Sequence, residues 1–391
     1  MNKALFDGKF GMEKEGLRLN LDGSLAQSPH PFEDDPEVYK DFCESQAEII
    51  TPVADSTDEL YAHLIRITDR VNCVLGRQGE FLWNFSNPPE DIDWSDIRVA
   101  EFDGDDLIKK EYRKYLLKKY GKKKMLYSGI HFNYSVSEEY LRGSNISADE
   151  LYLDLAVKVL AHAWLIVFLT AASPREGYAS PRCSEIGYWN DFLPVLDYNS
   201  LRGYVRSIED YINDGRLFSA WELYLPVRLK PRGSNTLEEL SKGINHIELR
   251  MLDVNPLDPA GFAQKDMEFL HLLLIYLINK QKVNGSVSLQ KDAVDNMKKA
   301  AVMDTSSVMI RKDGKEIPIE EAALDVLSDM AMFFEPMCDA KIMRCIADQR
   351  DKILMKDGRY AVTVGKYIEE KEYVRTVRDK LNGKDKHTKA S

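Results

Sequence analysis

Four separated segments of this chain alternate between polar and mostly apolar side chains, and this repeat of two constrains the fold more than any other feature. A period of two places every second side chain on the same face of a β-strand. The four segments read FGMEKEGLRL, DFCESQAEIITP, SGIHFNYSV and NHIELRMLDVNP. The sequence therefore predicts four strands, each with one polar and one apolar face.

The polar faces of these strands share an unusual chemistry. A solvated strand face usually mixes Lys, Thr and Glu, whereas these faces collect carboxylates and other potential metal ligands. Their polar residues are Glu13 and Glu15; Glu44, Gln46 and Glu48; His131 and Asn133; and His246, Glu248 and Arg250. None of them is a lysine, and Lys14 falls on the opposite face. For any single segment, a face that merely meets water remains the competing interpretation.

Carboxylates crowded onto one sheet repel one another and raise each other's pKa unless a cation lies between them. Mg²⁺ fits this role, because it prefers oxygen ligands and keeps coordination positions open for water and substrate phosphates. The imidazole of His131 would suit Mn²⁺ as well. Taken together, the four faces predict a metal and nucleotide site on a curved sheet.

The rest of the chain is mostly helical in pattern. Residues 9–20 and the turn at Asp22-Gly23 predict a hairpin, and Ser56 with Glu59 predicts a capping box. Residues 173–200 are rich in Pro, Gly and Asn, which predicts a functional loop. Helices are expected from Ser56 onward and over 107–120, 148–172, 262–281, 289–302, 319–334 and 339–355, with strands over 124–136 and 245–254. We expect an α+β protein with a catalytic region at 1–258 and a helical region at 259–391 packed on the same domain.

Composition narrows the class of partner. The chain has 391 residues and a formal net charge of −11, with acids and bases scattered, so it lacks the basic footprint of a nucleic-acid or membrane-surface protein. Small molecules are the expected partners. The apolar run at 270–278 is too short to span a bilayer, the N-terminus lacks the pattern of a signal peptide, and the tail after Leu381 is polar. We expect a cytoplasmic protein, and five widely spaced cysteines argue against disulfides and structural zinc.

These segments, in this order, resemble the bacterial glutamate–cysteine ligase family, and in particular the ligase portion of bifunctional glutathione-synthesising enzymes. The similarity covers most of residues 9–260. The matching stretches are FGMEKEGLRLNLDGSLA, DFCESQAEIITP, LWNFSNPP, YRKYLLKKYGK, SGIHFNYSV, RCSEIGY, ELYLPVRLKPR and IELRMLDVNPLDP.

The resemblance implies a glutamine synthetase-like fold, in which a curved antiparallel sheet forms half a funnel with helices packed outside. It implies ATP-dependent joining of glutamate to cysteine through a γ-glutamyl phosphate. The metal ligands would be Glu13, Glu15, Asp41, Glu48, His131 and Glu248, and Arg250 would contact the transferring phosphate. Asp41 rests on the resemblance alone. The amino-acid pockets would be lined by Phe42, Tyr112, Leu116, Arg182, Tyr188 and Tyr224.

The chain departs from the family pattern beside the acceptor pocket. Met125 and Tyr127 stand where many relatives carry a glutamine and a small aliphatic residue. A ligase of the same machinery that uses another amine is therefore an open alternative, as is a non-catalytic nucleotide-binding homologue. Past about residue 290 the chain matches the family poorly. Since no ATP-grasp module follows, we expect no glycine addition.

Overall fold

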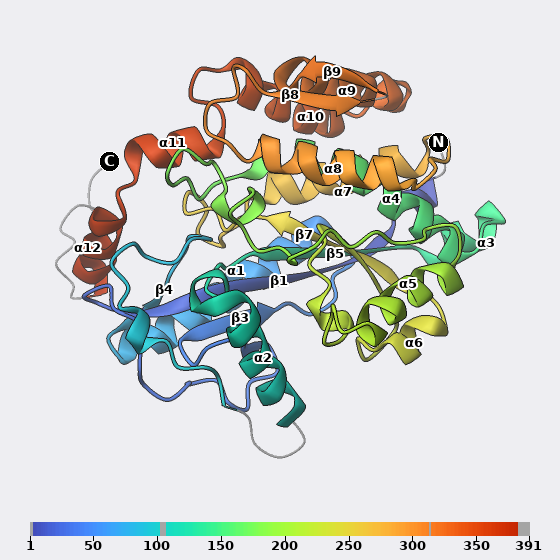
Figure 1. Ribbon diagram of the computed structural model, residues 1–391. Coiled ribbons are helices and arrows are strands. Elements are labelled where there is room, and N and C mark those ends of the chain that lie inside the picture. The colour runs from blue at the N-terminus through green and yellow to red at the C-terminus, as the bar shows by residue number, and fades with distance from the viewer. Residues whose placement is uncertain (1–2, 102–106, 313, 382–391) are drawn as a thin grey trace.

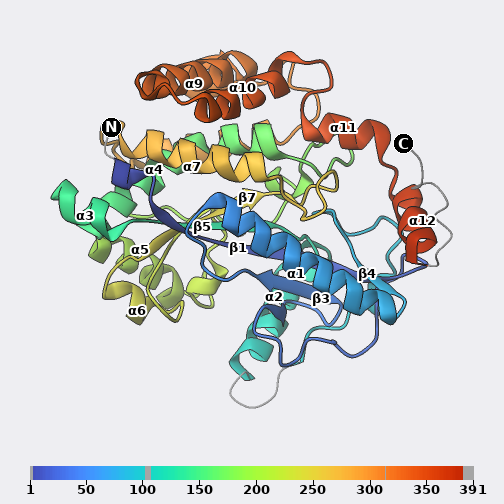
Figure 2. The ribbon, with the colours of Figure 1, turned by 180° about the vertical axis from the view of Figure 1, so that it is seen from behind.

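The computed structural model describes residues 3–101, 107–312 and 314–381; the polar tail, expected to be frayed, lies outside them. A mixed helical and antiparallel fold is observed, which confirms the predicted α+β class. In Figure 1 an open sheet crosses the middle of the molecule, with long helices layered above it and smaller helices below it. Figure 2 shows the same layers from behind, with α1 (Thr57–Arg77) lying across the sheet.

The sheet has seven strands, and every pairing in it is antiparallel. The strand order is β2-β3-β1-β5-β7-β6, and β4 pairs with β1 outside this path. The long first strand is central because its two ends pair with different neighbours. The strands are β1 (Gly8–Asn20), β2 (Val38–Lys40), β3 (Gln46–Ile50), β4 (Glu80–Leu82), β5 (Ile130–Val136), β6 (Val227–Lys230) and β7 (His246–Leu252).

All four strands expected from the alternating segments are present, as β1, β3, β5 and β7. The strand expected over 124–136 is shorter, because α2 (Leu107–Lys124) ends in a turn in which the Met125 amide donates to the Lys122 carbonyl. Met125 and Leu126 are buried in that turn. Their apolar character therefore reflects packing and not strand alternation.

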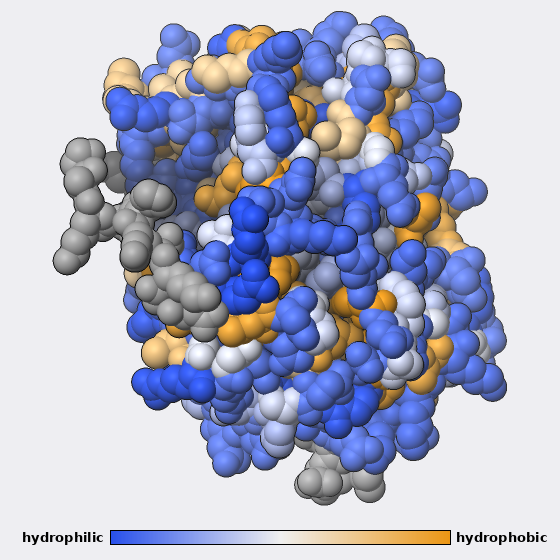
Figure 3. Space-filling model, turned by 90° about the vertical axis from the view of Figure 1, so that its left-hand side faces the viewer, coloured by the Kyte–Doolittle hydropathy of each residue, from blue (hydrophilic) through white to orange (hydrophobic). Residues whose placement is uncertain are grey.

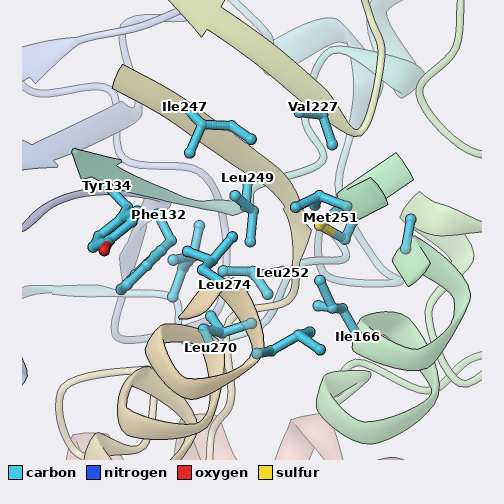
Figure 4. Close-up of a cluster of buried hydrophobic side chains, with 14 of the residues drawn as sticks. Phe132, Tyr134, Ile166, Val227, Ile247, Leu249, Met251, Leu252, Leu270 and Leu274 are labelled. Carbon is cyan, nitrogen blue, oxygen red and sulfur yellow. The ribbon is translucent and has the colours of Figure 1, made fainter. Parts of the chain in front are cut away.

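The apolar faces of the strands pack on two long helices. Phe132 and Leu249 from the sheet meet Leu270 and Leu274 of α7 (Gln264–Ile278), and Ile166 of α4 (Ala148–Thr170) closes the cluster, as Figure 4 shows. All of these side chains are buried, and burial of a Leu, Ile or Phe side chain contributes about 1.5–3 kcal/mol. The helices thus hold one face of the sheet and leave the other face for the polar residues.

Helix α1 begins where the sequence predicts. The Ser56 hydroxyl accepts a hydrogen bond from the Glu59 amide at 3.1 Å, while the Glu59 carboxylate accepts from the Asp55 amide at 2.7 Å and so caps one residue earlier than expected. The turn after β1 is also present, with Gly23 at a φ of 91° and a bridge between Leu19 and Leu25. Positive φ favours glycine at this position.

The C-terminal third is a helical layer, as expected, with one addition. The short hairpin of β8 (Met309–Lys312) and β9 (Lys315–Pro318) was not predicted, because two strands of four residues give too few repeats for a period of two to stand out. The helices of this region are α7, α8 (Val287–Ala300), α9 (Ile319–Phe334), α10 (Ala340–Leu354), α11 (Tyr360–Tyr367) and α12 (Glu370–Leu381).

The predicted division at 258/259 stays a prediction. Residues from both sides of that position share one continuous hydrophobic cluster, such as Leu249 and Leu270. The remaining helices, α3 (Glu138–Ser144), α5 (Leu201–Asn213) and α6 (Leu237–Ser241), lie near one end of the sheet (Figure 1).

Within the described ranges, α4 is the one helix long and apolar enough to cross a membrane, and 83% of its most apolar window is buried inside the protein. Its burial is that of a core helix. The face of the molecule drawn in Figure 3 is largely hydrophilic, with apolar side chains scattered in small groups.

Candidate active site

Strand register brings the polar residues of the alternating segments together. Glu13 on β1 lies opposite His131 on β5, and Glu15 lies opposite Glu48 on β3. On the next pair of strands, Asn133 lies opposite Glu248 of β7. Because the period of every strand is two, these side chains all project from the face opposite the helices. A carboxylate cluster results at the centre of the sheet.

His131 lies at the centre of this cluster. Its Nδ1 is 2.8 Å from Glu13 Oε2 and 3.9 Å from Glu248 Oε1, and its Nε2 is 3.7 Å from Glu15 Oε1. The other Glu15 oxygen accepts a hydrogen bond from the Gly129 amide at 2.8 Å. One imidazole thus contacts carboxylates through both of its nitrogen atoms.

Glu248 is the most buried carboxylate of the cluster and has cations on both sides. Lys230 Nζ lies 3.1 Å from Oε1, and Arg250 Nη1 lies 3.1 Å from Oε2. The contact with Arg250 has hydrogen-bond geometry, whereas the fully buried Oε1 accepts no hydrogen bond from the residues that the structure describes. A buried oxygen with this unused acceptor capacity suits a bound cation.

The carboxylates differ in their electrostatic surroundings. Burial raises the pKa of Glu48 well above its usual range, and the nearby Asp41, Glu13 and Glu15 carboxylates raise it further. Burial likewise raises the pKa of Glu15. Burial would also raise the pKa of Glu248, but Lys230 and Arg250 outweigh it and hold that pKa well below its usual range. Neighbouring cations therefore keep the Glu248 carboxylate ionised, whereas burial and the carboxylates around Glu48 favour its protonated form.

Within the described part of the chain, two groups of three side chains are close enough to hold a metal ion. One consists of Glu13, His131 and Glu248, and the other of Glu15, Glu48 and His131, and in each the ligand atoms lie within 4.8 Å of one another. Four carboxylates and one imidazole are a donor set for Mg²⁺ or Mn²⁺. The residues present thus fit divalent metal binding.

A cavity of about 320 Å³ opens above the cluster, and the side chains that line it are of two chemical kinds, which we call its two halves. The polar half is lined by Glu13, Glu15, Glu48, His131 and Arg250. The other half is a mainly aromatic and apolar wall, which we call the aromatic arm, lined by Phe42, Tyr112, Leu116, Met125, Tyr188 and Tyr224. A molecule in this cavity can place one end at the carboxylates and the other against aromatic rings.

Three tyrosines hold the aromatic arm together. The hydroxyls of Tyr112 and Tyr224 lie 3.1 Å apart, and the rings of Tyr188 and Tyr224 are 4.2 Å apart between centroids. They come from three separate segments, namely α2, the loop after α4 and the segment before β6. The loop expected over 173–200 thus lines the cavity through Arg182 and Tyr188.

Comparison with known proteins places this site in a family. A model of the glutamate–cysteine ligase family matches residues 1–179 and 211–300, which is more than half of the chain. The chain belongs to the glutamate–cysteine ligase family. This confirms the resemblance carried by the alternating segments.

Relatives of this ligase-family chain agree with that assignment. It is 35% identical to the glutathione biosynthesis bifunctional protein GshAB of Listeria monocytogenes serovar 1/2a, across 96% of this chain and 54% of the relative. The bifunctional protein of Clostridium perfringens strain 13 is 32% identical across 82% of this chain and 46% of the relative. The chain therefore spans about half the length of these bifunctional relatives.

Solved structures share the fold. A bifunctional glutathione synthetase from Pasteurella multocida aligns with a TM-score of 0.81 and 25% identity, over 97% of this chain and 53% of that one. A glutamate–cysteine ligase from Francisella tularensis in complex with AMP aligns with a TM-score of 0.86 and 21% identity, over 98% of this chain and 90% of that one. The predicted glutamine synthetase-like sheet, open on one side, is thereby confirmed as the fold.

Most predicted site residues of this family member lie around one cavity. Twelve of the thirteen predicted side chains line it, and Glu248 lies directly beneath, in contact with His131 and Arg250. The twelve are Glu13, Glu15, Asp41, Phe42, Glu48, Tyr112, Leu116, His131, Arg182, Tyr188, Tyr224 and Arg250. Their individual roles stay predictions.

Two of these residues are placed differently from what their predicted roles suggest. Asp41 belongs to neither three-residue metal group among the described residues, and its carboxylate lies 3.7 Å from Arg113. The Arg182 Nη atoms donate to the carbonyls of Arg250 and Leu252, so the main chain already occupies those donors. Both roles, metal ligand and carboxylate receptor, remain to be tested.

The alternating segments also contain polar residues that do not join the cluster. Glu44 accepts a hydrogen bond from the Glu101 amide, and Gln46 accepts one from the Phe42 amide. Both side chains bond loop amides near the start of β3, because the strand begins only at Gln46. Asn133 and His246 line a second cavity farther along the same face.

Lys230 and Arg228 were missed by the sequence analysis, although VRLK alternates as the other strands do. Both line the cavity from β6, and Lys230 pairs with Glu248. The four strand faces predicted from the sequence contain no lysine, yet β6 brings Lys230 to the site. Only the β6–β7 register, with Arg228 opposite Glu248, reveals this.

Proposed function

We propose that this protein is an ATP-dependent ligase that joins the γ-carboxylate of glutamate to the amine of cysteine through a γ-glutamyl phosphate. The observation that carries the proposal is one cavity in which a carboxylate–imidazole cluster with a partly buried arginine faces an aromatic arm. Family membership supports the same chemistry. The reaction needs both halves, because a phosphate must be transferred at one and an amine delivered from the other.

Glutamate is activated at the polar half. A carboxylate is a poor electrophile, so phosphorylation by ATP must precede attack by the amine, and phosphoryl transfer mainly requires positioning and charge neutralisation. We propose that divalent ions are held by six side chains of the cluster and its surroundings. These are Glu13, Glu15, Asp41, Glu48, His131 and Glu248. Bound Mg²⁺, or Mn²⁺, supplies charge neutralisation for phosphate oxygens.

Arg250 is the proposed catalytic residue. Its Nη1 donates to Glu248, which fixes the guanidinium over the cluster, and the neighbouring carboxylates raise the pKa of Arg250 above its already high value. A guanidinium that is permanently charged and held in place suits the stabilisation of a transferring phosphoryl group.

ATP is proposed to lie along the polar face toward the second cavity. That cavity, about 1020 Å³ in volume, shares this face of β1, β5 and β7, and its lining includes Gly11, Asn133 and His246. Gly11 pairs with Asn133 and lies two residues from Glu13, so a nucleotide here would direct its phosphates to the cluster. Because Gly11 has no side chain, the space above the backbone at this position stays open.

The acceptor is proposed to occupy the aromatic arm. Its amine must reach a carbon held at the carboxylates, so the remainder of the acceptor extends into the other half of the same cavity. Tyr112, Tyr188 and Tyr224 then surround a small side chain, and Leu116 and Phe42 add apolar contact. Arg182 also lines the cavity and is the candidate partner of a substrate carboxylate, although its Nη atoms already donate to main-chain carbonyls.

A second acceptor class is favoured by one observation, because Met125 and Tyr127 both line the cavity. Met125 offers no amide to hydrogen bond an acceptor, and the bulk of Tyr127 reshapes the space. We therefore keep a ligase for glutamate and a different amine as the second candidate. In either case the proposed partners are small molecules, and the proposed location is the cytoplasm.

An acceptor screen tests both candidates. The protein is incubated with ATP, Mg²⁺, glutamate and one amine at a time, and acceptor-dependent phosphate release is measured alongside mass-spectrometric detection of the γ-glutamyl product. We expect cysteine to give the highest kcat/KM. A different amine that exceeds cysteine by tenfold or more would favour the second candidate, and no acceptor-dependent release with any amine would refute both.

A further inference from the structure

Glu222 is a fully buried carboxylate that lies behind the aromatic arm and does not line the cavity. It ends the short 3₁₀ helix Ala220–Glu222. One oxygen, Oε1, accepts from the Tyr120 hydroxyl at 2.6 Å, from Lys119 Nζ at 2.7 Å and from the Tyr115 hydroxyl at 3.3 Å. The other, Oε2, accepts from the Phe218 amide at 2.6 Å. Each oxygen of this buried charge is therefore hydrogen bonded.

The three side-chain donors all belong to α2, the helix that supplies one wall of the cavity. Tyr115 and Lys119 are four residues apart on α2, as are Tyr112 and Leu116, which line the cavity, and Tyr120 follows Leu116 by four residues. Residues three and four apart share a side of a helix, so the side chains held by Glu222 flank the two that meet the substrate and fix the rotation of the helix. Lys119 also donates to the Arg216 carbonyl at 2.6 Å.

Asn190 extends the same network to the other two tyrosines. Its Nδ2 donates to the Glu222 carbonyl at 2.7 Å and to the Tyr120 hydroxyl at 3.1 Å, while its Oδ1 accepts from the Tyr224 amide at 2.9 Å. Asn190 follows Tyr188 by two residues. The network centred on Glu222 thus joins all three segments that carry the tyrosines of the aromatic arm.

The ion pair between Glu222 and Lys119 contributes little net free energy to holding these segments together. Desolvation of a carboxylate and an ammonium group offsets most of their attraction, and apolar packing would stabilise the fold at least as well. The buried charge instead restricts geometry, because a carboxylate with all its hydrogen bonds made allows its donors few arrangements. Such a restriction is useful here, because the three segments that it joins are distant in sequence and carry the rings that face the substrate.

We propose that Glu222 is a positioning residue that sets the spacing of the aromatic arm and thereby the affinity for the acceptor. The inference rests on the proposed ligase function and goes beyond it, because Glu222 touches neither substrate nor the carboxylate cluster. Its loss lets α2 turn or shift and separates the tyrosine hydroxyls, while the polar half keeps its geometry.

Steady-state kinetics of Glu222→Ala and Glu222→Gln test this role. In Glu222→Ala we expect KM for the acceptor to rise about tenfold, with kcat and KM for ATP within about twofold of wild type. Glu222→Gln keeps one acceptor oxygen and replaces the other with an amide nitrogen that donates, so it should recover about a third of the loss. The matched control is Asp266→Asn, a buried carboxylate on α7 paired with Lys352 at 2.6 Å, which should lower Tm without changing either KM.

Limited trypsin digestion supplies a readout that needs no turnover. Lys114 and Lys118 are exposed on α2, so we expect faster cleavage there in Glu222→Ala than in wild type or Asp266→Asn. If Glu222→Ala does not fold, Tyr120→Phe removes one hydroxyl that bonds both Glu222 and Asn190, and an increase of about threefold in acceptor KM is expected.

The outcomes separate this inference from the proposed function. A wild-type protein without acceptor-dependent phosphate release refutes the ligase proposal. An active wild type combined with unchanged acceptor KM in Glu222→Ala, or with equal rises in KM for ATP and acceptor, refutes the positioning role. Equal cleavage of α2 in Glu222→Ala and wild type refutes it as well, whatever the activity.

Discussion

Glu48 and Glu248 are both predicted metal ligands, but the charged groups around them have opposite signs. Glu48 lies among Asp41, Glu13 and Glu15, and its pKa is raised. Glu248 lies between Lys230 and Arg250, and its pKa is lowered. Removing the charge therefore relieves repulsion at one position and leaves two unpaired cations at the other.

We predict that Glu48→Gln and Glu248→Gln each reduce kcat by at least about 100-fold, since each removes a group that neutralises developing charge. In metal-free protein at pH 8, measured by thermal unfolding in EDTA, Glu48→Gln should raise Tm and Glu248→Gln should lower it. Glu44→Gln, in the same alternating segment but outside the cavity, is the control and should keep its activity. Near-normal turnover in either ligand variant would remove that residue from the site.

His271 illustrates a titration outside the site. The imidazole is mostly enclosed by Phe6, Phe10 and Tyr134, and its Nε2 has no hydrogen-bond partner among the described residues. Burial lowers the pKa of His271 from 6.5 to about 4. The folded protein holds this side chain neutral, so it loses stability as the unfolded chain gains a proton below pH 6.5.

We predict that His271→Leu makes the protein less sensitive to acid. A shift from 6.5 to about 4 corresponds to about 3 kcal/mol of unfolding free energy that is present above pH 6.5 and lost by about pH 4. Urea unfolding at pH 7.5 and pH 5 should show a smaller difference in His271→Leu than in wild type. The partly exposed His63→Leu serves as control, and an unchanged pH difference in His271→Leu would contradict the assignment.

At the scale of elements, β1 links the two cavities. Glu13 and Glu15 lie at the carboxylate cluster, whereas Gly11 lies on the floor of the second cavity. A Cβ atom at Gly11 would meet only Asn133 Cβ, at the ordinary contact distance of 3.7 Å. A side chain at this position would therefore fit the backbone and project into the space proposed for ATP.

We predict that the series Gly11→Ala and Gly11→Val raises KM for ATP in steps, by about threefold and about tenfold, while KM for the acceptor stays within about twofold. Thermal unfolding should show no loss of stability, because valine suits a strand better than glycine does. An unchanged KM for ATP in Gly11→Val would mean that the nucleotide lies elsewhere.

At the scale of the whole molecule, the mutual repulsion of the cluster couples metal binding to stability. Metal ions compete with protons for carboxylates, and burial raises the pKa of Glu15 and Glu48 in the folded protein. A divalent ion that binds the folded state alone stabilises it, by about 2.7 kcal/mol at one hundred times its dissociation constant.

We predict that Mg²⁺ raises Tm, that the increase is larger at pH 8 than at pH 5.5, and that EDTA reverses it. Na⁺ at matched ionic strength is the control, and Glu48→Gln should show a smaller increase than wild type. Equal shifts with Na⁺ and Mg²⁺ would indicate screening of surface charge and would contradict a metal site.

Four of the strands, the chemistry of their polar faces and the family could be predicted from the sequence alone, because a period of two and a run of motifs are local properties. Glu13, Glu15, His131 and Glu248 could be named for this reason. The sequence could not determine which faces meet. Glu44 and Gln46 share the pattern of Glu48 yet lie outside the site, since the end of a strand depends on its neighbours.

The way in which side chains from distant segments combine depends on the tertiary structure. The register of β6 with β7 brings Lys230 to Glu248, and the packing of α2 brings Lys119 and Tyr120 to Glu222. More than 100 residues separate Glu222 from those two partners. Nothing local encodes such contacts, because their energy exists only once the segments have folded against one another.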